Sequence, residues 1–242
     1  MSANAYLGAF PIAAALAAGA DIVVTGRCVD SAVTLAPLIH AFGWTAADHD
    51  LLAQGSLAGH LIECGTQATG GNYTDWDTVP GWDDMGFPIA ECRADGSFDI
   101  TKPEGTGGLV CPSTVGEQML YEIGDPRAYI LPDVVCDFTG VTLTQIGPDR
   151  VEVKGARGLP PTDQAKVSVT YADGFRAMSL FMIGGIDAGA KAQRVGAAML
   201  ARMRRHYRER GWPDFTETSI EAIGAEDTYG PVSYTHLTLP TT

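Results

Sequence analysis

The sequence predicts an α/β fold: an open, mostly parallel sheet flanked by helices, followed by a smaller β-β-α unit. Residues 21–25 (DIVVT) are β-branched or apolar on successive positions, which is typical of a strand covered on both faces. Helix-forming segments precede and follow this run, and a tight loop joins it to the second of them. Beyond residue 161, strand-like segments lead into a long helical pattern. Together these observations indicate alternating helices and strands.

Composition restricts the class of protein before any motif is considered. The 242 residues are 45% apolar and 19% charged, which is typical of a globular chain. The formal net charge of −13 repels polyanions, so we expect neither a nucleic-acid nor a membrane partner. The five cysteines are dispersed and no apolar run is long enough to span a membrane. We therefore expect a cytoplasmic protein with reduced thiols.

Two helices are expected on either side of the 21–25 strand. Pro11 suits a first turn and Gly19 a stop, so the first helix covers about residues 12–18. The second runs over residues 32–42, with Asp30 or Ser31 as its cap and Gly43 as its end.

The loop between that strand and the second helix contains Gly26, Arg27 and Asp30. In open α/β sheets, ligands bind beyond the carboxyl ends of the strands, where this loop is expected. Arg27 could hold a carboxylate or a phosphate there, or it could form a structural ion pair with Asp30.

A third helix over about residues 50–64 would carry His60, Glu63 and Cys64 on one face. A base, an acid and a thiol on one stripe suit acid–base or nucleophilic catalysis. The alternative is a buried thiol beside a hydrogen-bonded histidine at a helix end. The spacing is not that of a zinc site, so no metal is expected.

The segment after this helix continues the candidate site. Gly70 and Gly71 would let the backbone approach a ligand, with Asn72 and Asp75 following, although a plain turn is the alternative. Residues 76–88 are expected to form a surface loop, and residues 89–100 a hairpin around the Asp95-Gly96 dipeptide.

A glycine-rich stretch, residues 104–126, is the second candidate binding element. Gly107 and Gly108 precede a helix predicted to start at Thr114, with Glu117 at capping-box spacing and Gly124 at its end. Exposed amides there could hold phosphate, or the stretch could be a flexible connection.

The rest of the chain is expected to be strands and one long helix. Strands are predicted over residues 129–138, 141–146 and 149–155, then a boundary near residue 160. The second unit, residues 161–230, should contain two strands joined at Asp173-Gly174 and a helix over residues 187–210. That helix is basic and could bind an anionic ligand, although a solvated face is the alternative.

Three stretches resemble one known family. They read ANAYLGAFPIAAALAAGADIVVTGRCVDSA, HLIECGTQATGGNY and STVGEQMLYEIGDPRAYILPDVVCDF, and they are similar to the acyclic terpene utilisation family. The resemblance implies a role in the catabolism of branched isoprenoid acids as coenzyme A thioesters, with no assigned reaction. It also implies that residues 1–160 are a partial α/β domain in a chain truncated at both ends. Residues 231–242 share nothing with the family and resemble a non-native tail on a metagenomic gene fragment.

Two functional hypotheses follow. The first is a lyase- or hydratase-like enzyme acting on an acyl-CoA or branched organic acid, as a possible homo-oligomer. The second is a non-catalytic acyl-CoA-binding or assembly protein of the same pathway. The cofactor is unknown, with a coenzyme A thioester expected as substrate. The candidate catalytic residues are Asp30, His60, Glu63, Cys64 and Asp75, and the candidate substrate-binding residues are Gly26, Arg27, Gly70, Gly71, Asn72, Gly107, Gly108 and Thr114.

Overall fold

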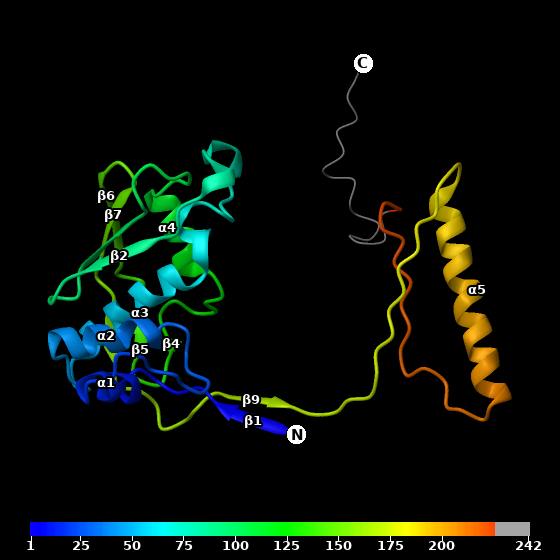
Figure 1. Cartoon of the computed structure of the whole chain (residues 1–242), viewed down its shortest axis with the longest axis horizontal. Helices are drawn as coiled ribbons and strands as arrows, with labels where there is room; N and C mark the ends of the chain where they lie inside the picture. The colour runs from blue at the N-terminus through cyan, green and yellow to red at the C-terminus, as the bar shows by residue number, and fades with distance from the viewer. Residues whose placement is uncertain (226–242) are drawn as a thin grey trace, which may run out of the picture. The chain divides into compact units, whose positions relative to one another are not determined.

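The computed structural model describes residues 1–225, which form parts of two compact units, residues 1–172 and residues 173–242 (Figure 1). The first unit contains four α-helices and all of the assigned strands. The described part of the second contains one long helix. The expected tail, residues 231–242, lies outside the described residues.

The first two helices lie where the sequence predicts them. Helix α1 spans Phe10–Ala17 with proline in its first turn, and α2 spans Ala32–Phe42. Ser31 is the N-cap residue of α2, although its side chain makes no capping hydrogen bond. Asp133 anchors the start of α1, because its Oδ2 accepts a hydrogen bond of 2.7 Å from the Ala9 backbone N–H.

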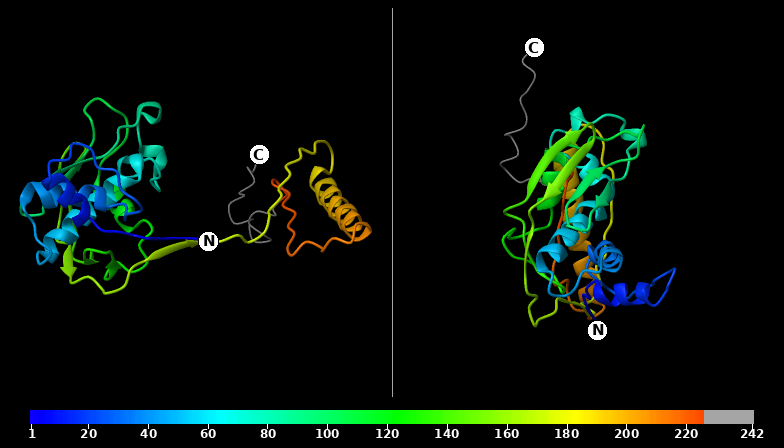
Figure 2. Two further views of the ribbon diagram at one scale, coloured as in Figure 1. Left: turned by 60° about the horizontal axis from the view of Figure 1, so that its bottom comes forward. Right: turned by 90° about the vertical axis from the view of Figure 1, so that its left-hand side faces the viewer.

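Helix α3, His49–Glu63, is the centre of the first unit. It packs against α2 on one side and against the strands on the other, and residues 52–61 are all buried (Figure 2). Its small residues allow this close packing: a Cβ on Gly59 would lie 2.8 Å from the Cα of Ser31. The buried Gln54 side chain donates to the Val153 carbonyl and accepts from the Ala156 N–H, so α3 is also hydrogen-bonded to the strand region.

The strands form three sheets in the described residues. A four-stranded sheet has the order β2 (Ile89–Cys92), β3 (Phe98–Thr101), β7 (Arg150–Lys154), β6 (Thr142–Gly147). A three-stranded sheet has the order β4 (Tyr129–Ile130), β5 (Val135–Asp137), β8 (Arg157–Leu159). The third is a ribbon of β1 (Ser2–Ala5) and β9 (Val167–Thr170).

The predicted open, mostly parallel sheet is wrong. Every pairing between strands in the described residues is antiparallel. The physical reason lies in the connections: β2 joins β3, and β6 joins β7, through loops of a few residues, whereas a parallel pair needs a crossover of a dozen or more. Among residues 1–225, the parallel pairings are two isolated bridges, Leu7 with Cys28 and Met85 with Gly107.

The strand predicted at residues 21–25 is also absent. This segment has no assigned strand, and the side chains of Ile22 and Val24 are 83% and 91% exposed. A β-branched run becomes a strand only where a neighbour supplies hydrogen bonds and a layer covers it. In the described structure no strand pairs with this run, and Val23 packs against the core while Ile22 and Val24 are left exposed.

Helix α4 spans Pro112–Leu120, so it begins two residues before the predicted start at Thr114 and ends before the predicted end at Gly124. Cys111 is its N-cap residue and Thr114 lies one turn inside, where its hydroxyl accepts from the Cys111 N–H at 3.0 Å. The three intervening short helices are η1 (Gly65–Thr69), η2 (Trp76–Thr78) and η3 (Trp82–Asp84). The hairpin predicted around Asp95-Gly96 is confirmed by the pairing of β2 with β3.

The second unit differs from the predicted β-β-α arrangement. Helix α5 spans Ala188–Glu209, close to the prediction. However, β9 pairs with β1 rather than with a second strand, and no strand is assigned between residues 171 and 187. No helix in the described part of the chain is long and apolar enough to cross a membrane.

Gly43 provides a test of the local interactions that end α2. It has a left-handed φ of 68° and donates its N–H to the Ile39 carbonyl, and a Cβ added at this position would have no atom within 4 Å. Gly43→Ala should therefore lower the free energy of unfolding by about 1 kcal/mol through backbone strain alone. Gly124→Ala is the matched control, since it also has open space but no left-handed φ. Equal effects of the two changes in urea denaturation would contradict this explanation.

Candidate functional site

His60 and Glu63 form a pair at the end of α3. The His60 Nδ1 atom lies 3.2 Å from Glu63 Oε1, one helical turn away. The His60 side chain is 3% exposed and the Glu63 side chain 17%, so the imidazole is buried and the carboxylate is the more accessible of the two. The pair places an imidazole and a carboxylate, two groups used in acid–base catalysis, side by side.

The surroundings of His60 hold its backbone in place but leave both ring nitrogens without a hydrogen-bond partner in the described residues. The Gln118 side chain of α4 donates 2.8 Å to the His60 backbone carbonyl, and the Tyr129 ring lies 5.8 Å from the imidazole, centroid to centroid. Within the described residues, neither His60 Nδ1 nor His60 Nε2 has a hydrogen-bond partner, and the Nδ1 contact with Glu63 is one of distance and charge. A buried polar atom without a partner is unfavourable unless a ligand or water satisfies it.

Cys64 lies beside this pair in a negative environment. Burial raises the pKa of its thiol, and the charges of Glu63, Glu122 and Asp30 raise it further. A hydrogen bond from Gln118 lowers the pKa but does not outweigh these effects. The thiol is therefore disfavoured as a thiolate, which weakens the case for a nucleophilic cysteine. Asp30, from the loop before α2, is thus close enough to affect a residue at the end of α3.

Tyr129 is a member of this site that the sequence did not indicate. Burial raises its pKa to about 12, with further contributions from the charges of Glu63, Cys136, Asp30 and Glu122. Its phenol therefore stays protonated at neutral pH and can act as a hydrogen-bond donor. We name the group of Asp30, His60, Glu63, Cys64, Gln118, Glu122 and Tyr129 the α3-end site.

Gln118 and Glu122 were also missed, and only Glu122 has a distinctive local feature. Its φ of 59° is left-handed, which is uncommon for a residue other than glycine, asparagine or aspartate. The sequence alone does not reveal this conformation. Gln118 is recognised only once α4 is packed against α3.

Arg27 makes its contacts with Tyr6 instead of with an acidic residue. Its Nη2 donates to the Tyr6 hydroxyl at 2.8 Å, and its guanidinium lies 4.4 Å from the Tyr6 ring centroid. No ion pair joins Arg27 to Asp30 in the described part of the chain. Gly26 lies in the same exposed loop, with open space around its Cα.

The Gly70-Gly71 pair forms a tight turn against the protein itself. A Cβ on Gly70 would lie 2.9 Å from the Val79 side chain, and one on Gly71 would lie 2.5 Å from the Thr66 hydroxyl. Asn72 and Asp75 are exposed beyond the turn. The Asp75 backbone carbonyl accepts the Thr78 hydroxyl at 2.8 Å, at the start of η2.

The glycine-rich loop before α4 has its amides occupied. Gly107 N–H donates to the Asp84 carbonyl and Gly108 N–H to the Pro80 carbonyl, each at 2.8 Å. Thr114 is buried and its hydroxyl is bonded to Cys111. These groups fasten the loop of residues 80–86 to the start of α4, so they are not directed at a bound anion.

The donor groups of residues 1–225 do not form a metal site. No group of three or more His, Cys, Asp or Glu side chains in this range is arranged to hold an ion. The α3-end site thus supplies an imidazole, carboxylates and a phenol for acid–base chemistry.

Comparison with known proteins identifies a family. No curated protein and no solved structure matches the chain. The family model described as "Acyclic terpene utilisation family protein AtuA" matches residues 1–238, which is nearly the whole sequence. The chain therefore belongs to the acyclic terpene utilisation family, which confirms the resemblance of its three sequence stretches.

Proposed function

We propose that the chain is an enzyme of acyclic terpene utilisation that adds water to, or removes it from, a branched acyl-CoA thioester at the α3-end site. The observation that carries this proposal is the buried His60, whose Nδ1 lies 3.2 Å from Glu63 and whose two ring nitrogens have no hydrogen-bond partner in the described residues. A histidine beside a carboxylate, with ring nitrogens that no protein group occupies, can transfer a proton to or from a ligand. Family membership supports the substrate class.

The charge of the site favours one kind of transition state. Asp30, Glu63 and Glu122 all raise the pKa of Tyr129, so all three carboxylates act on the space beside it. Two unit charges about 7 Å apart interact by roughly 2 kcal/mol at an effective dielectric constant of about 20. Such a field disfavours an enolate and stabilises developing positive charge.

Hydration of a trisubstituted double bond develops that positive charge. His60 would deliver a proton to one alkene carbon, leaving a tertiary cation at the other, and water would add there and lose its proton to Asp30 or Glu122. The neutral Tyr129 would donate a hydrogen bond to the product hydroxyl. In this scheme Cys64 is a lining residue, since its raised pKa disfavours the thiolate.

A second candidate is favoured by a different observation. His60 is only 2% exposed, and an imidazole so covered also suits a structural role in a non-catalytic acyl-CoA-binding protein. Binding without turnover would be the signature of this alternative.

The two candidates are separated by incubating the full chain with matched thioesters in ¹⁸O-labelled water. We expect a branched unsaturated acyl-CoA to gain one labelled water, at least about a hundredfold faster than a straight-chain acyl-CoA of equal length, because only the branched substrate forms a tertiary cation. Mass spectrometry measures the product. Calorimetric binding without labelled product would support the non-catalytic binding protein. If the thioester gives no binding heat and no labelled product, both candidates are wrong.

A further inference from the structure

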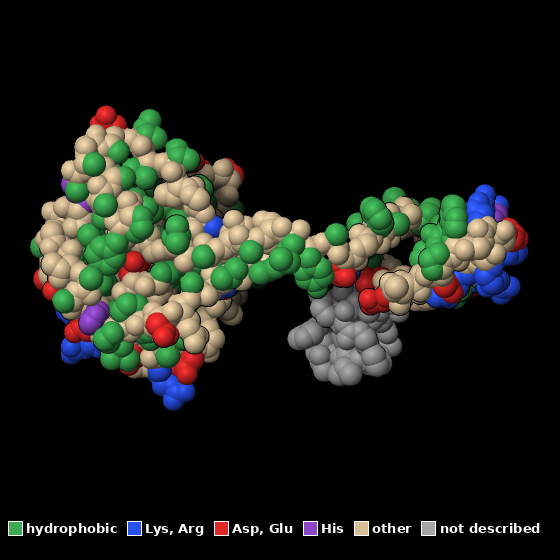
Figure 3. All heavy atoms as spheres, turned by 90° about the horizontal axis from the view of Figure 1, so that it is seen from below, with side chains coloured by type: hydrophobic (Ala, Val, Ile, Leu, Met, Phe, Trp, Pro, Cys, Tyr) green, Lys and Arg blue, Asp and Glu red, His purple; other side chains and the backbone are tan. Residues whose placement is uncertain are grey.

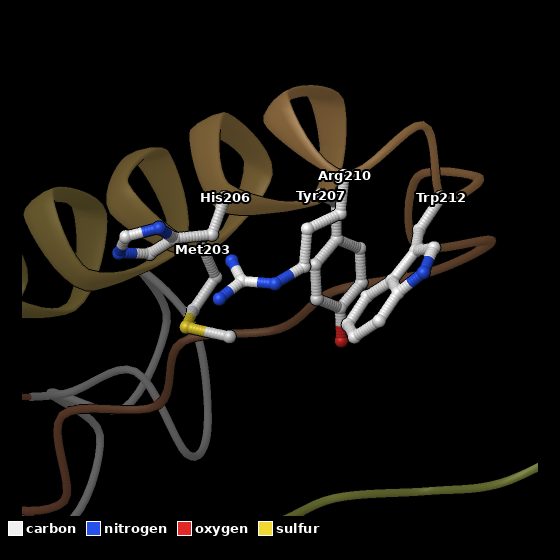
Figure 4. Close-up of a pocket in the computed structure, with 5 residues that line it drawn as sticks. All are labelled: Met203, His206, Tyr207, Arg210 and Trp212. Atoms are coloured by element: carbon white, nitrogen blue, oxygen red, sulfur yellow. The ribbon is translucent and has the colours of Figure 1, made fainter.

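The carboxyl-terminal end of α5 bears a hollow that the α3-end site does not involve. It has a volume of about 310 Å³ and is lined by Met203, His206, Tyr207, Arg210 and Trp212 (Figure 4). All five belong to the last turns of α5 and the residues just after it. The volume is at the lower end of the range for small-ligand sites, which starts at about 300 Å³.

Core packing explains only part of this arrangement. Tyr207 packs against Phe215 at 4.7 Å between ring centroids, which holds the chain that returns along α5. Trp212, by contrast, is 58% exposed and meets Tyr207 edge-on at 5.8 Å. The two rings thus form an apolar wall that is open to solvent.

Arg210 adds a positive charge to this wall. Its guanidinium lies 5.6 Å from the Trp212 ring centroid, and in Figure 4 it extends beside Met203 and Tyr207. Among residues 1–225 no carboxylate is within ion-pair distance of it, whereas neighbouring Arg204 and Arg205 have Asp214 and Glu209. A guanidinium fork with no acidic partner is suited to phosphate or carboxylate.

The positive charge of α5 favours an anionic ligand, although the carboxyl-terminal end of a helix dipole is itself negative. Residues 188–210 contain seven Lys or Arg and one Glu, in a chain of net charge −13. Figure 3 shows basic side chains gathered at the end of the second unit. A helix carboxyl terminus disfavours anions, but here the carbonyls of His206, Tyr207 and Arg208 are already bonded to the N–H groups of residues 210–212.

We propose that this hollow binds a flat heteroaromatic ring carrying a phosphate, as in a nucleotide, with the ring against Tyr207 and Trp212 and the phosphate on Arg210. The aromatic wall can stack against the ring of any nucleobase, and the arginine favours ligands that carry a phosphate over those that do not. The site belongs to the second unit and is independent of catalysis at the α3-end site.

The test is a titration of the ¹⁵N-labelled full chain with adenosine 3′-phosphate, adenosine and inorganic phosphate, following the four tryptophan indole N–H signals. Trp212 is assigned by Trp212→Phe. The nucleotide should shift the Trp212 signal saturably and leave those of Trp44, Trp76 and Trp82 in place. Adenosine or phosphate alone should bind at least about tenfold more weakly, because each lacks one of the two contacts.

Arg210→Gln should weaken nucleotide binding about tenfold or more, and Arg208→Gln should leave it unchanged. Arg208 is the matched control, being an exposed arginine in the last turn that does not line the hollow. No shift at Trp212, or equal losses in both variants, would overturn the proposal. The unliganded spectrum of each variant shows whether it is folded.

Discussion

Asp99→Asn is expected to lower the free energy of unfolding by about 2 kcal/mol. Asp99 is 3% exposed on β3, and its Oδ2 accepts hydrogen bonds from Arg93 at 2.7 Å and from Arg150 at 3.0 Å. Charged hydrogen bonds contribute about 1.5–3 kcal/mol each. Removing these hydrogen bonds lowers the stability less than breaking a fully buried ion pair would. The reason is that both arginines are partly exposed and can be rehydrated.

The effect should depend on pH in a defined direction. Burial alone would raise the pKa of the Asp99 carboxyl, but the hydrogen bonds and charges of Arg93 and Arg150 outweigh it and hold the pKa below its ordinary value of 3.8. A carboxyl with a lowered pKa in the folded state stabilises the fold above its unfolded pKa and loses that contribution as the pH falls through the folded value. The difference between wild type and variant should be constant above about pH 5 and shrink below the ordinary pKa.

Urea denaturation at several pH values measures both quantities. Asp77→Asn is the control, because Asp77 is an exposed acid without an ion pair in the described residues. Its effect should stay within about 0.5 kcal/mol at every pH. A loss in Asp99→Asn that persists unchanged below the ordinary pKa would show that shape, and not charge, accounts for the stability.

The parts of the fold that the sequence predicts well are those decided by local interactions. Helix α2 has the predicted bounds because an apolar periodicity and a left-handed Gly43 act within a few residues. The β2–β3 hairpin is correct for the same reason, since Asp95 and Gly96 decide the turn. By contrast, residues 21–25 have the local preference of a strand, but a strand also requires neighbours that no local pattern can specify.

In the candidate site, too, the contacts between residues close in sequence are predictable and those that depend on tertiary packing are not. His60 and Glu63 meet because they are one helical turn apart, which the sequence predicts directly. Tyr129 reaches His60 from a strand 69 residues later, and its position depends on the pairing of β4 with β5 and on packing against Phe138. Gly107 and Gly108 illustrate the opposite error, since glycine amides that look free in a sequence are bonded to the backbone of another loop.

His60→Gln is expected to reduce kcat for hydration of the branched thioester about a thousandfold, as expected for the loss of a general acid. The change keeps a polar side chain of similar length but removes the group that transfers the proton. Stability should fall by no more than about 1 kcal/mol, because the Gln118 hydrogen bond to residue 60 uses the backbone carbonyl. His49→Gln, at the other end of α3, is the control and should leave kcat unchanged.

The pairing of His60 with Glu63 also predicts how the effects of substitutions at the two positions on kcat combine. If Glu63 acts through His60, Glu63→Gln should lower kcat, and the double variant should be no slower than His60→Gln alone, since residues that act as one unit are not additive. Independent roles would instead multiply the two losses. If His60→Gln melts at a lower temperature but retains the full kcat, the histidine is structural and the non-catalytic binding protein becomes the better assignment.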